Sequence, residues 1–310
     1  MSPFDFDTPI DRTAFPTMSV HRDALGDIFG NPDALPLWVA DMDFAAPEGG
    51  LAVLRQRADH GLYGYAYMPE SFDAAFTDWY ATRQNWRIDP ETVEQVPSVL
   101  NAIAVLIDQH SDPGDGVIVQ PPVFFEFGSV ISANGRKRVK NRLKLVDGVY
   151  EMDYDDLAEK AANPKNKVMI VCNPHNPVGR VWTRDELARA AEICSANDVL
   201  LIDYEMECYL FYTPHTVTPL ATVSAEVAQQ TVTVLSPAKT FNIAGMVDAM
   251  AIIGDGERRE RYHDFAHRFQ INKTNVFALA AMEAAYREGG PWLNALLTYL
   301  QGNIDFVTAF

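Results

Sequence analysis

The sequence predicts an α/β fold with a mostly parallel sheet that helices cover on both faces. From about residue 98 to residue 253, short apolar segments of strand length alternate with longer segments that carry apolar residues at helical spacing. This alternation is typical of parallel sheets, because the crossover between two parallel strands is usually a helix. A length of 310 residues and a hydrophobic content of 48% allow a large core.

The expected elements follow one another in a regular order. The first are a helix over 99–110, a strand over 116–120 and a helix over 124–133. Further strands are expected over 168–172, 199–203 and 231–235. A helix over 183–195 begins with a capping box, in which the Thr183 hydroxyl and the Glu186 carboxylate can accept hydrogen bonds from backbone amides of the first turn.

The two ends of the chain differ from its middle. Residues 1–45 are rich in proline, aspartate and phenylalanine and are expected to form an irregular arm. Residues 290–310 carry apolar side chains at helical spacing up to Phe310, so we expect the chain to end inside a helix.

Composition narrows the function classes. A formal charge of −17 argues against a nucleic-acid partner, because phosphate contacts need clustered lysine and arginine, and we interpret the short basic cluster at 136–142 as a solvated edge. No apolar run is long enough to span a membrane, and the N-terminus lacks the pattern of a signal peptide. The three cysteines have no metal-ligand spacing, so we expect no metal site and a cytoplasmic location.

Polar side chains stand where three of the expected strands end. Lys239 follows the strand 231–235, Asp203 ends the strand 199–203, and the segment 173–179 (Asn-Pro-His-Asn-Pro-Val-Gly) follows the strand 168–172. In open α/β sheets, ligands bind at the carboxyl ends of the strands. Burial there disfavours the charged form of a lysine, and a neutral amine is a nucleophile that can form a Schiff base with an aldehyde cofactor. Taken singly, Lys239 could be a surface lysine and Asp203 a helix cap.

The order of these motifs resembles that of the fold-type I pyridoxal-phosphate enzymes, which are aminotransferase class I/II-like. Within them the chain is similar to the MalY/PatB cystathionine β-lyase (C–S lyase) group. The resemblance rests on three segments and covers nearly the whole chain: Leu-Pro-Leu-Trp-Val-Ala-Asp-Met-Asp-Phe at 35–44, Gly-Leu-Tyr-Gly-Tyr at 61–65 and Lys-Thr-Phe-Asn-Ile-Ala-Gly at 239–245. It implies three parts: an N-terminal arm with a small-domain segment over 1–45, a seven-stranded, cofactor-binding large domain over 46–285, and the start of a connecting helix and C-terminal small domain over 286–310. The small domain would be truncated in this chain.

The resemblance also implies the roles of three residues toward pyridoxal 5'-phosphate. Lys239 would hold the cofactor as a Schiff base and later take the Cα proton of an amino acid substrate. Asp203 would pair with the pyridine nitrogen and keep the ring protonated. Asn176 would donate a hydrogen bond to the phenolic oxygen of the cofactor.

Phosphate binding is implied for the start of the helix 99–110 and for two other positions. Ser98, Val99 and Leu100 would present free amides of a helix N-terminus to the phosphate, and Ser236 would complete the site. Ser98 could instead be a plain helix cap. Tyr65 matches a tyrosine that reaches the phosphate of the other subunit, which implies a homodimer with shared active sites. It could instead be an interface or core tyrosine.

Three positions depart from the pattern of the group. Phe124 stands where an aromatic residue, usually tyrosine, stacks on the cofactor ring, although it could be an ordinary core residue. Met206 replaces a histidine, and Ala238 replaces a serine.

The resemblance leaves three functions open. The first is a C–S β-lyase that converts cystathionine or related S-substituted cysteines to a thiol, pyruvate and ammonia. The second is an aminotransferase, which needs the same lysine, aspartate and asparagine. The third, favoured by the departures at Met206 and Ala238, is a non-catalytic, pyridoxal-phosphate-binding regulatory or degenerate protein.

Overall fold

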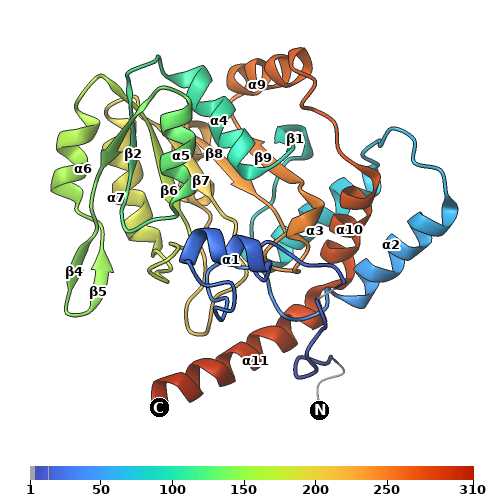
Figure 1. The fold of residues 1–310 in the computed structure, drawn as a ribbon. Helices are drawn as coiled ribbons and strands as arrows, with labels where there is room; N and C mark the ends of the chain where they lie inside the picture. Colours follow the sequence, from blue (N-terminus) through green and yellow to red (C-terminus); the bar gives the residue numbers. More distant parts are fainter. Residues whose placement is uncertain (1–3, 13) are drawn as a thin grey trace.

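A computed structural model describes residues 4–12 and 14–310, and it is built around a seven-stranded sheet. The strand order is β1-β9-β8-β7-β6-β2-β3. Strands β8, β7, β6, β2 and β3 run parallel, whereas β9 is antiparallel to both β8 and β1. The prediction of an α/β fold with a mostly parallel seven-stranded sheet is therefore confirmed (Figure 1).

The strands of this sheet are β1 (Val93–Val96), β2 (Gly116–Val119), β3 (Lys137–Lys140), β6 (Asn166–Cys172), β7 (Leu200–Tyr204), β8 (Thr231–Leu235) and β9 (Ala249–Ile253). A separate two-stranded hairpin consists of β4 (Lys144–Val146) and β5 (Val149–Glu151). The α-helices are α1 (Arg22–Phe29), α2 (Glu48–His60), α3 (Glu70–Gln84), α4 (Val99–His110), α5 (Glu126–Ala133), α6 (Tyr154–Ala161), α7 (Arg184–Ser195), α8 (Ala225–Gln230), α9 (Gly256–Arg268), α10 (Val276–Glu288) and α11 (Gly290–Ala309).

Helices cover both faces of the sheet, because successive strand residues point to opposite sides. Val117 and Val119 of β2 lie in the core that α4, α5 and α9 cover. Ile118, between them, lies in a second core beneath α6 and α7. The long helix α11 instead extends away from the sheet (Figure 1).

A third, aromatic-rich core joins one end of the sheet to α3, α10 and α11. Phe76 and Tyr80 of α3 pack against Tyr286 of α10, and Trp292 of α11 packs against Phe241. Each of these rings is at least 96% buried. Phe241 and Ile243, which follow Lys239 in the chain, belong to this core. The core therefore fixes the turn that contains Lys239.

The helices and strands expected from the sequence are present, with shifts of one or two residues at some ends. The capping box of α7 is formed as predicted. Two features differ. The arm 1–45 contains the helix α1, which buries Leu25 and ends at Gly30 in the left-handed conformation that glycine favours. In the basic cluster 136–142, Arg136 is buried because its guanidinium donates to the carbonyl and side-chain oxygens that end α4.

In the part of the chain that the structure describes, no helix is both long and apolar enough to cross a bilayer. Cys172, Cys194 and Cys208 are free thiols, and all three are buried.

Truncation of Leu106 to alanine should lower the free energy of unfolding by about 2–5 kcal/mol, because it leaves a cavity in the core between α4 and the sheet. Leu106 is fully buried. Urea unfolding monitored by circular dichroism measures the loss, and the exposed Ser129→Ala in α5 is the control. An equal effect of the two substitutions would contradict the assignment of this core.

Candidate active site

The register of the sheet brings the expected site residues to one edge. Asp203 pairs with Val171 of β6 and with Thr233 of β8, so the carboxyl ends of these three parallel strands lie side by side. The turn with Lys239 follows β8 directly. Because β9 is antiparallel to β8, residue 248 at its start lies at the same edge.

Lys239 lies half-buried in the turn that follows β8. The backbone of this turn is fixed on both sides of the lysine: the amide of Phe241 donates to the carbonyl of Pro237 over 3.0 Å, and the amide of Ile243 donates to the carbonyl of Ala238 over 2.9 Å. Its neighbour Thr240 is fully buried. The amine is therefore carried by a rigid turn and remains partly accessible from the sheet edge.

Asp203 is fully buried at the carboxyl end of β7. Its Oδ2 accepts a hydrogen bond from the backbone amide of Leu220 over 2.8 Å. Its Oδ1 receives no hydrogen bond from any N–H or hydroxyl group of residues 4–12 and 14–310. Burial raises the pKa of the Asp203 carboxyl above its usual range. One oxygen of this carboxyl is thus fixed by the protein, and the other can accept a donor from a ligand.

Asn176 lies in a loop whose backbone is held at several points. The amide of Asn173 donates to the carbonyl of Tyr204 over 3.0 Å, and the amide of Gly179 donates to the carbonyl of His175 over 2.9 Å. Gly179 has a φ of 73°, which glycine adopts without strain. The Asn176 side chain donates from Nδ2 to Glu207 Oε1 over 3.3 Å, so its amide points toward the turn after β7.

Glu207 is an acidic residue of the site that the sequence reasoning missed. Its carboxyl interacts electrostatically with the Lys239 amine, and its Oε2 is buried and receives no hydrogen bond from the described residues. Burial raises the pKa of Glu207 from 4.5 to about 7, although Asn176 and Lys239 act in the opposite direction. Glu207 therefore links Asn176 and Lys239, two residues that the sequence placed on different strands.

Glu205 is a second acidic residue that the sequence reasoning missed. It follows β7 directly, is fully buried, and its carboxyl group lies beside that of Asp203. Burial and the neighbouring Asp203 both raise the pKa of Glu205 well above its usual range. The only signal in the sequence is the alternation of acidic residues at 203, 205 and 207, which would ordinarily indicate a solvated strand end.

The residues expected to bind phosphate lie at the same edge, but their hydroxyls are partly engaged. Ser98 is the N-cap of α4, and its Oγ accepts from the amide of Asn101 over 3.1 Å. Ser236 donates to the carbonyl of Asp248 over 2.8 Å and accepts from the amide of Ala238. These contacts leave the first amides of α4, at Val99 and Leu100, as the donors available to an anion.

Two further expected residues, Phe124 and Tyr65, have their ring contacts with other residues than Lys239, Asp203 and Asn176. The ring of Phe124 stacks on Tyr204 with a centroid distance of 5.9 Å and an interplanar angle of 27°. Phe124 precedes α5, which begins at Glu126. Tyr65 is 98% exposed, and its ring lies 5.9 Å from the Lys273 amine.

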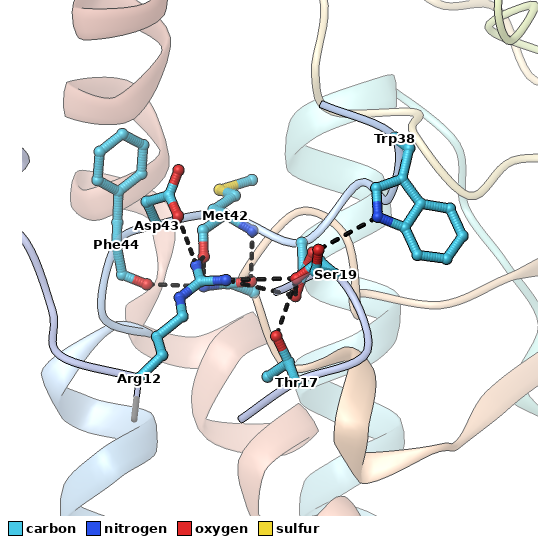
Figure 2. Close-up of polar contacts among 9 residues, drawn as sticks. Arg12, Thr17, Ser19, Trp38, Met42, Asp43 and Phe44 are labelled. Carbon is cyan, nitrogen blue, oxygen red and sulfur yellow. Dashed lines mark hydrogen bonds and ion pairs between the residues drawn. The ribbon is translucent and has the colours of Figure 1, made fainter. Parts of the chain in front are cut away.

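The N-terminal segment is fixed near the lysine turn by a network around Arg12 (Figure 2). The Arg12 guanidinium donates to the carbonyl of Met42 over 2.6 Å and pairs with Asp43 at 2.8 Å. Ser19 donates to the carboxylate of Asp41 over 2.8 Å. The segment that precedes α2 is therefore tied to the arm before α1.

Asn242 connects this segment to the turn that carries Lys239. Its Nδ2 donates to the carbonyls of Met42, over 3.1 Å, and Phe44, over 2.6 Å, while its Oδ1 accepts from the amide of Met42 over 2.9 Å. We call this set of three hydrogen bonds the Asn242 clamp. Asn242 follows Lys239 by three positions, so the clamp fixes residues 42–44 to the turn that carries the lysine.

Comparison with known proteins identifies the family of the chain. The chain matches the family "Aminotransferase class I and II" over residues 39–309 and belongs to it. Among curated relatives, cystathionine beta-lyase PatB of Bacillus subtilis is 40% identical over 95% of this chain and 76% of its own length. Protein MalY of Escherichia coli is 34% identical over 98% of this chain and 77% of its own length.

Solved structures show the same fold. Cystalysin from Treponema denticola, which contains a pyridoxal 5'-phosphate cofactor, superposes with a TM-score of 0.93 at 30% identity, over 98% of this chain and 77% of that chain. The pyridoxal-phosphate-bound C–S lyase from Staphylococcus hominis superposes with a TM-score of 0.92 at 29% identity, over 99% of this chain and 76% of that chain.

Removal of the Asn242 clamp should release the N-terminal segment. Asn242 has a φ of 54°, so Asn242→Gly keeps the backbone conformation and removes only the side-chain hydrogen bonds. We expect a loss of about 1–3 kcal/mol in the free energy of unfolding and faster proteolysis within residues 14–44. Limited proteolysis with mass spectrometry measures this, with Asn31→Gly as the control. Unchanged cleavage would contradict the clamp.

Replacement of Glu207 by glutamine should change how stability depends on pH in the cofactor-free protein. The pKa of Glu207 is raised in the folded state, so the folded protein binds this proton more tightly than the unfolded chain. Its contribution to stability is present below 4.5 and is lost as the pH rises through about 7. Glu207→Gln should remove up to about 3 kcal/mol of that pH-dependent loss.

Urea unfolding at a series of pH values measures this difference. Glu159→Gln, at an exposed glutamate of α6, is the control and should leave the profile unchanged. Parallel profiles for the parent protein and Glu207→Gln would show that Glu207 is not buried as described.

Proposed function

We propose that this chain is a pyridoxal-phosphate-dependent C–S β-lyase, which cleaves cystathionine or related S-substituted cysteines to a thiol, pyruvate and ammonia. The observation that carries the proposal is the meeting of Lys239, Asp203 and Asn176 at one sheet edge, with a buried oxygen of Asp203 open to a donor. The identity of 40% to cystathionine beta-lyase PatB supports the lyase over the aminotransferase.

The residues present fit the cofactor. The open Oδ1 of Asp203 can accept a hydrogen bond from a protonated ring nitrogen. The amide of Asn176 can donate to the phenolic oxygen, and the start of α4 with Ser98 can receive the phosphate. When bound, the cofactor withdraws electrons from Cα of the amino acid, which makes the Cα proton acidic and allows the Cβ–S bond to break.

The residues of the chain then have distinct tasks. Lys239 would hold the cofactor through its Nζ and would use the same atom to remove the Cα proton of the substrate. Asp203 would keep a negative charge beside the ring nitrogen in a buried site, where that charge acts more strongly than in water. Asn176 would keep its orientation because backbone hydrogen bonds hold the loop around it and Glu207 Oε1 accepts a hydrogen bond from its Nδ2.

We also propose a homodimer with shared active sites. The segment around Tyr65 is rich in exposed apolar side chains: Leu62 is 68%, Tyr65 98% and Tyr67 85% exposed. Large exposed apolar surfaces of this kind are typical of interaction sites. In the dimer, Tyr65 would reach the phosphate bound by the other subunit.

The organisation of the chain and its location follow the same interpretation. Residues 46–285 would form the cofactor-binding domain, and residues 1–45 and 286–310 would belong to a second, smaller domain. The three free, buried cysteines favour a cytoplasmic location.

Lys239→Ala should abolish cofactor attachment and catalysis. The parent protein, incubated with pyridoxal phosphate and desalted, should keep a visible absorption band and release pyruvate from cystathionine without a keto-acid acceptor. Lys239→Ala should lose the band and at least about 1,000-fold of the rate, because no other amine replaces it. Lys137→Ala, at an exposed edge lysine, is the control.

The same assay separates the alternatives. Pyruvate that forms only with a keto-acid acceptor would indicate an aminotransferase. A binding function that survives in Lys239→Ala would indicate a non-catalytic protein. Failure of the parent to retain the cofactor would refute the proposal.

Tyr65→Ala should weaken cofactor retention by about tenfold without lowering the stability of the fold, because its side chain is almost fully exposed within one chain. Equilibrium dialysis measures the dissociation constant of the cofactor, and sedimentation equilibrium measures the oligomeric state. The exposed Phe306→Ala in α11 is the control. A monomeric parent protein would contradict the shared site.

A further inference from the structure

Glu205 is held in a fixed place beside Asp203. Its backbone amide donates to the carbonyl of Val234 over 3.0 Å, which continues the pairing of β7 with β8 beyond the last strand residue. Because side chains two residues apart on an extended chain point to the same side, Glu205 and Asp203 face each other. Their carboxyl groups are close enough to interact directly. Both side chains are fully buried, and Asp203 Oδ1 and both Glu205 oxygens receive no hydrogen bond from an N–H or hydroxyl group of the described residues.

The surroundings of Glu205 offer no positive charge. On α3, Tyr80 lies near its carboxyl and Gln84 faces it. On the turn after β7, Cys208 and Tyr209 interact with it. Within the described chain, none of the groups that act on Glu205 is a cation. Both of its oxygens lack a hydrogen bond from an N–H or hydroxyl group of those residues.

Two carboxyl groups in contact in such a place cannot both be ionised, because each charge would be desolvated and would repel the other. One proton must lie between them, so the pair carries a single negative charge. Asp203 receives a backbone hydrogen bond from Leu220, which stabilises a carboxylate, whereas Glu205 has no comparable backbone donor. The negative charge is therefore better placed on Asp203 and the proton on Glu205.

We propose that Glu205 is a protonated carboxylic acid that donates its hydrogen bond to Asp203 and thereby keeps Asp203 as the carboxylate of the site. Glu205 is a positioning residue: it acts through Asp203 and does not touch the substrate. Its effect on the cofactor rests on the proposed function, in which Asp203 faces the ring nitrogen, while its protonation can be tested without any cofactor.

The first test is made on the cofactor-free protein. At about pH 8.5, above the pKa of about 7 of Glu207, the infrared spectrum should still contain the C=O band of a protonated carboxylic acid. The band should shift when glutamate, but not aspartate, carries ¹³C at its carboxyl group. It should be absent in Glu205→Gln and present in Glu207→Gln. A band that follows the aspartate label, or no band, would overturn the proposal.

The second test uses the sign of a change at Asp203. If Glu205 donates a proton to Asp203, its removal in Glu205→Leu should raise the pKa of Asp203, measured by ¹³C NMR on the labelled carboxyl group. If Glu205 were an anion, its removal would lower that pKa. Glu205→Gln keeps an N–H donor at the same position and should leave the Asp203 titration near that of the parent protein.

The third test connects the pair to the cofactor. Glu205→Leu should bind pyridoxal phosphate about tenfold or more weakly at pH about 8 and should shift the pH dependence of the visible band, whereas Glu205→Gln should bind within about threefold of the parent. Equal binding by Glu205→Leu would overturn the positioning role. If the parent binds no cofactor, the proposed function fails, but the first two tests still decide the protonation of Glu205.

Discussion

The parallel register of β6, β7 and β8 is the constraint on which the site depends. A shift by one residue would turn Asp203 to the opposite face of the sheet, because strand side chains alternate. Apolar residues on both faces of β7 prevent such a shift, since it would move Leu201 and Ile202 into the wrong cores. The position of Asp203 at the sheet edge is thus fixed by the burial of the two apolar residues that precede it.

Three acidic side chains lie at that edge of the sheet, where burial disfavours their ionised form. Asp203, Glu205 and Glu207 lie within five residues, and burial raises the pKa of each carboxyl group. Buried carboxyl groups usually lower the stability of a fold unless each is neutralised or hydrogen-bonded. Here a backbone amide, the Asn176 side chain and the Lys239 amine provide that compensation. Groups that stabilise the fold are therefore also the groups that face a ligand.

Much of this fold could be predicted from the sequence, and the site only in part. Helices such as α4 and α7 have strong apolar periodicity and side-chain caps, so local sequence determines them. Lys239, Asp203 and Asn176 follow apolar strands, and the topology of parallel sheets brings such positions together. Glu205 and Glu207 could not be placed, because acidic residues after a strand usually face water. The neighbours of Glu205 include Tyr80 and Gln84 of α3, and those of Glu207 include Asn176 and Lys239, so both carboxyl groups depend on contacts between distant segments.

The Asn242 clamp also has a consequence for how the protein is made. It joins residues 42–44 to a side chain about 200 positions later in the chain. Chains are synthesised from the N-terminus, so the early segment emerges from the ribosome long before its partner exists. During that interval its apolar residues lack their final contacts. The turn with Lys239 and Asn242 is synthesised late. The segment 42–44 can therefore reach its final position only after that turn has formed.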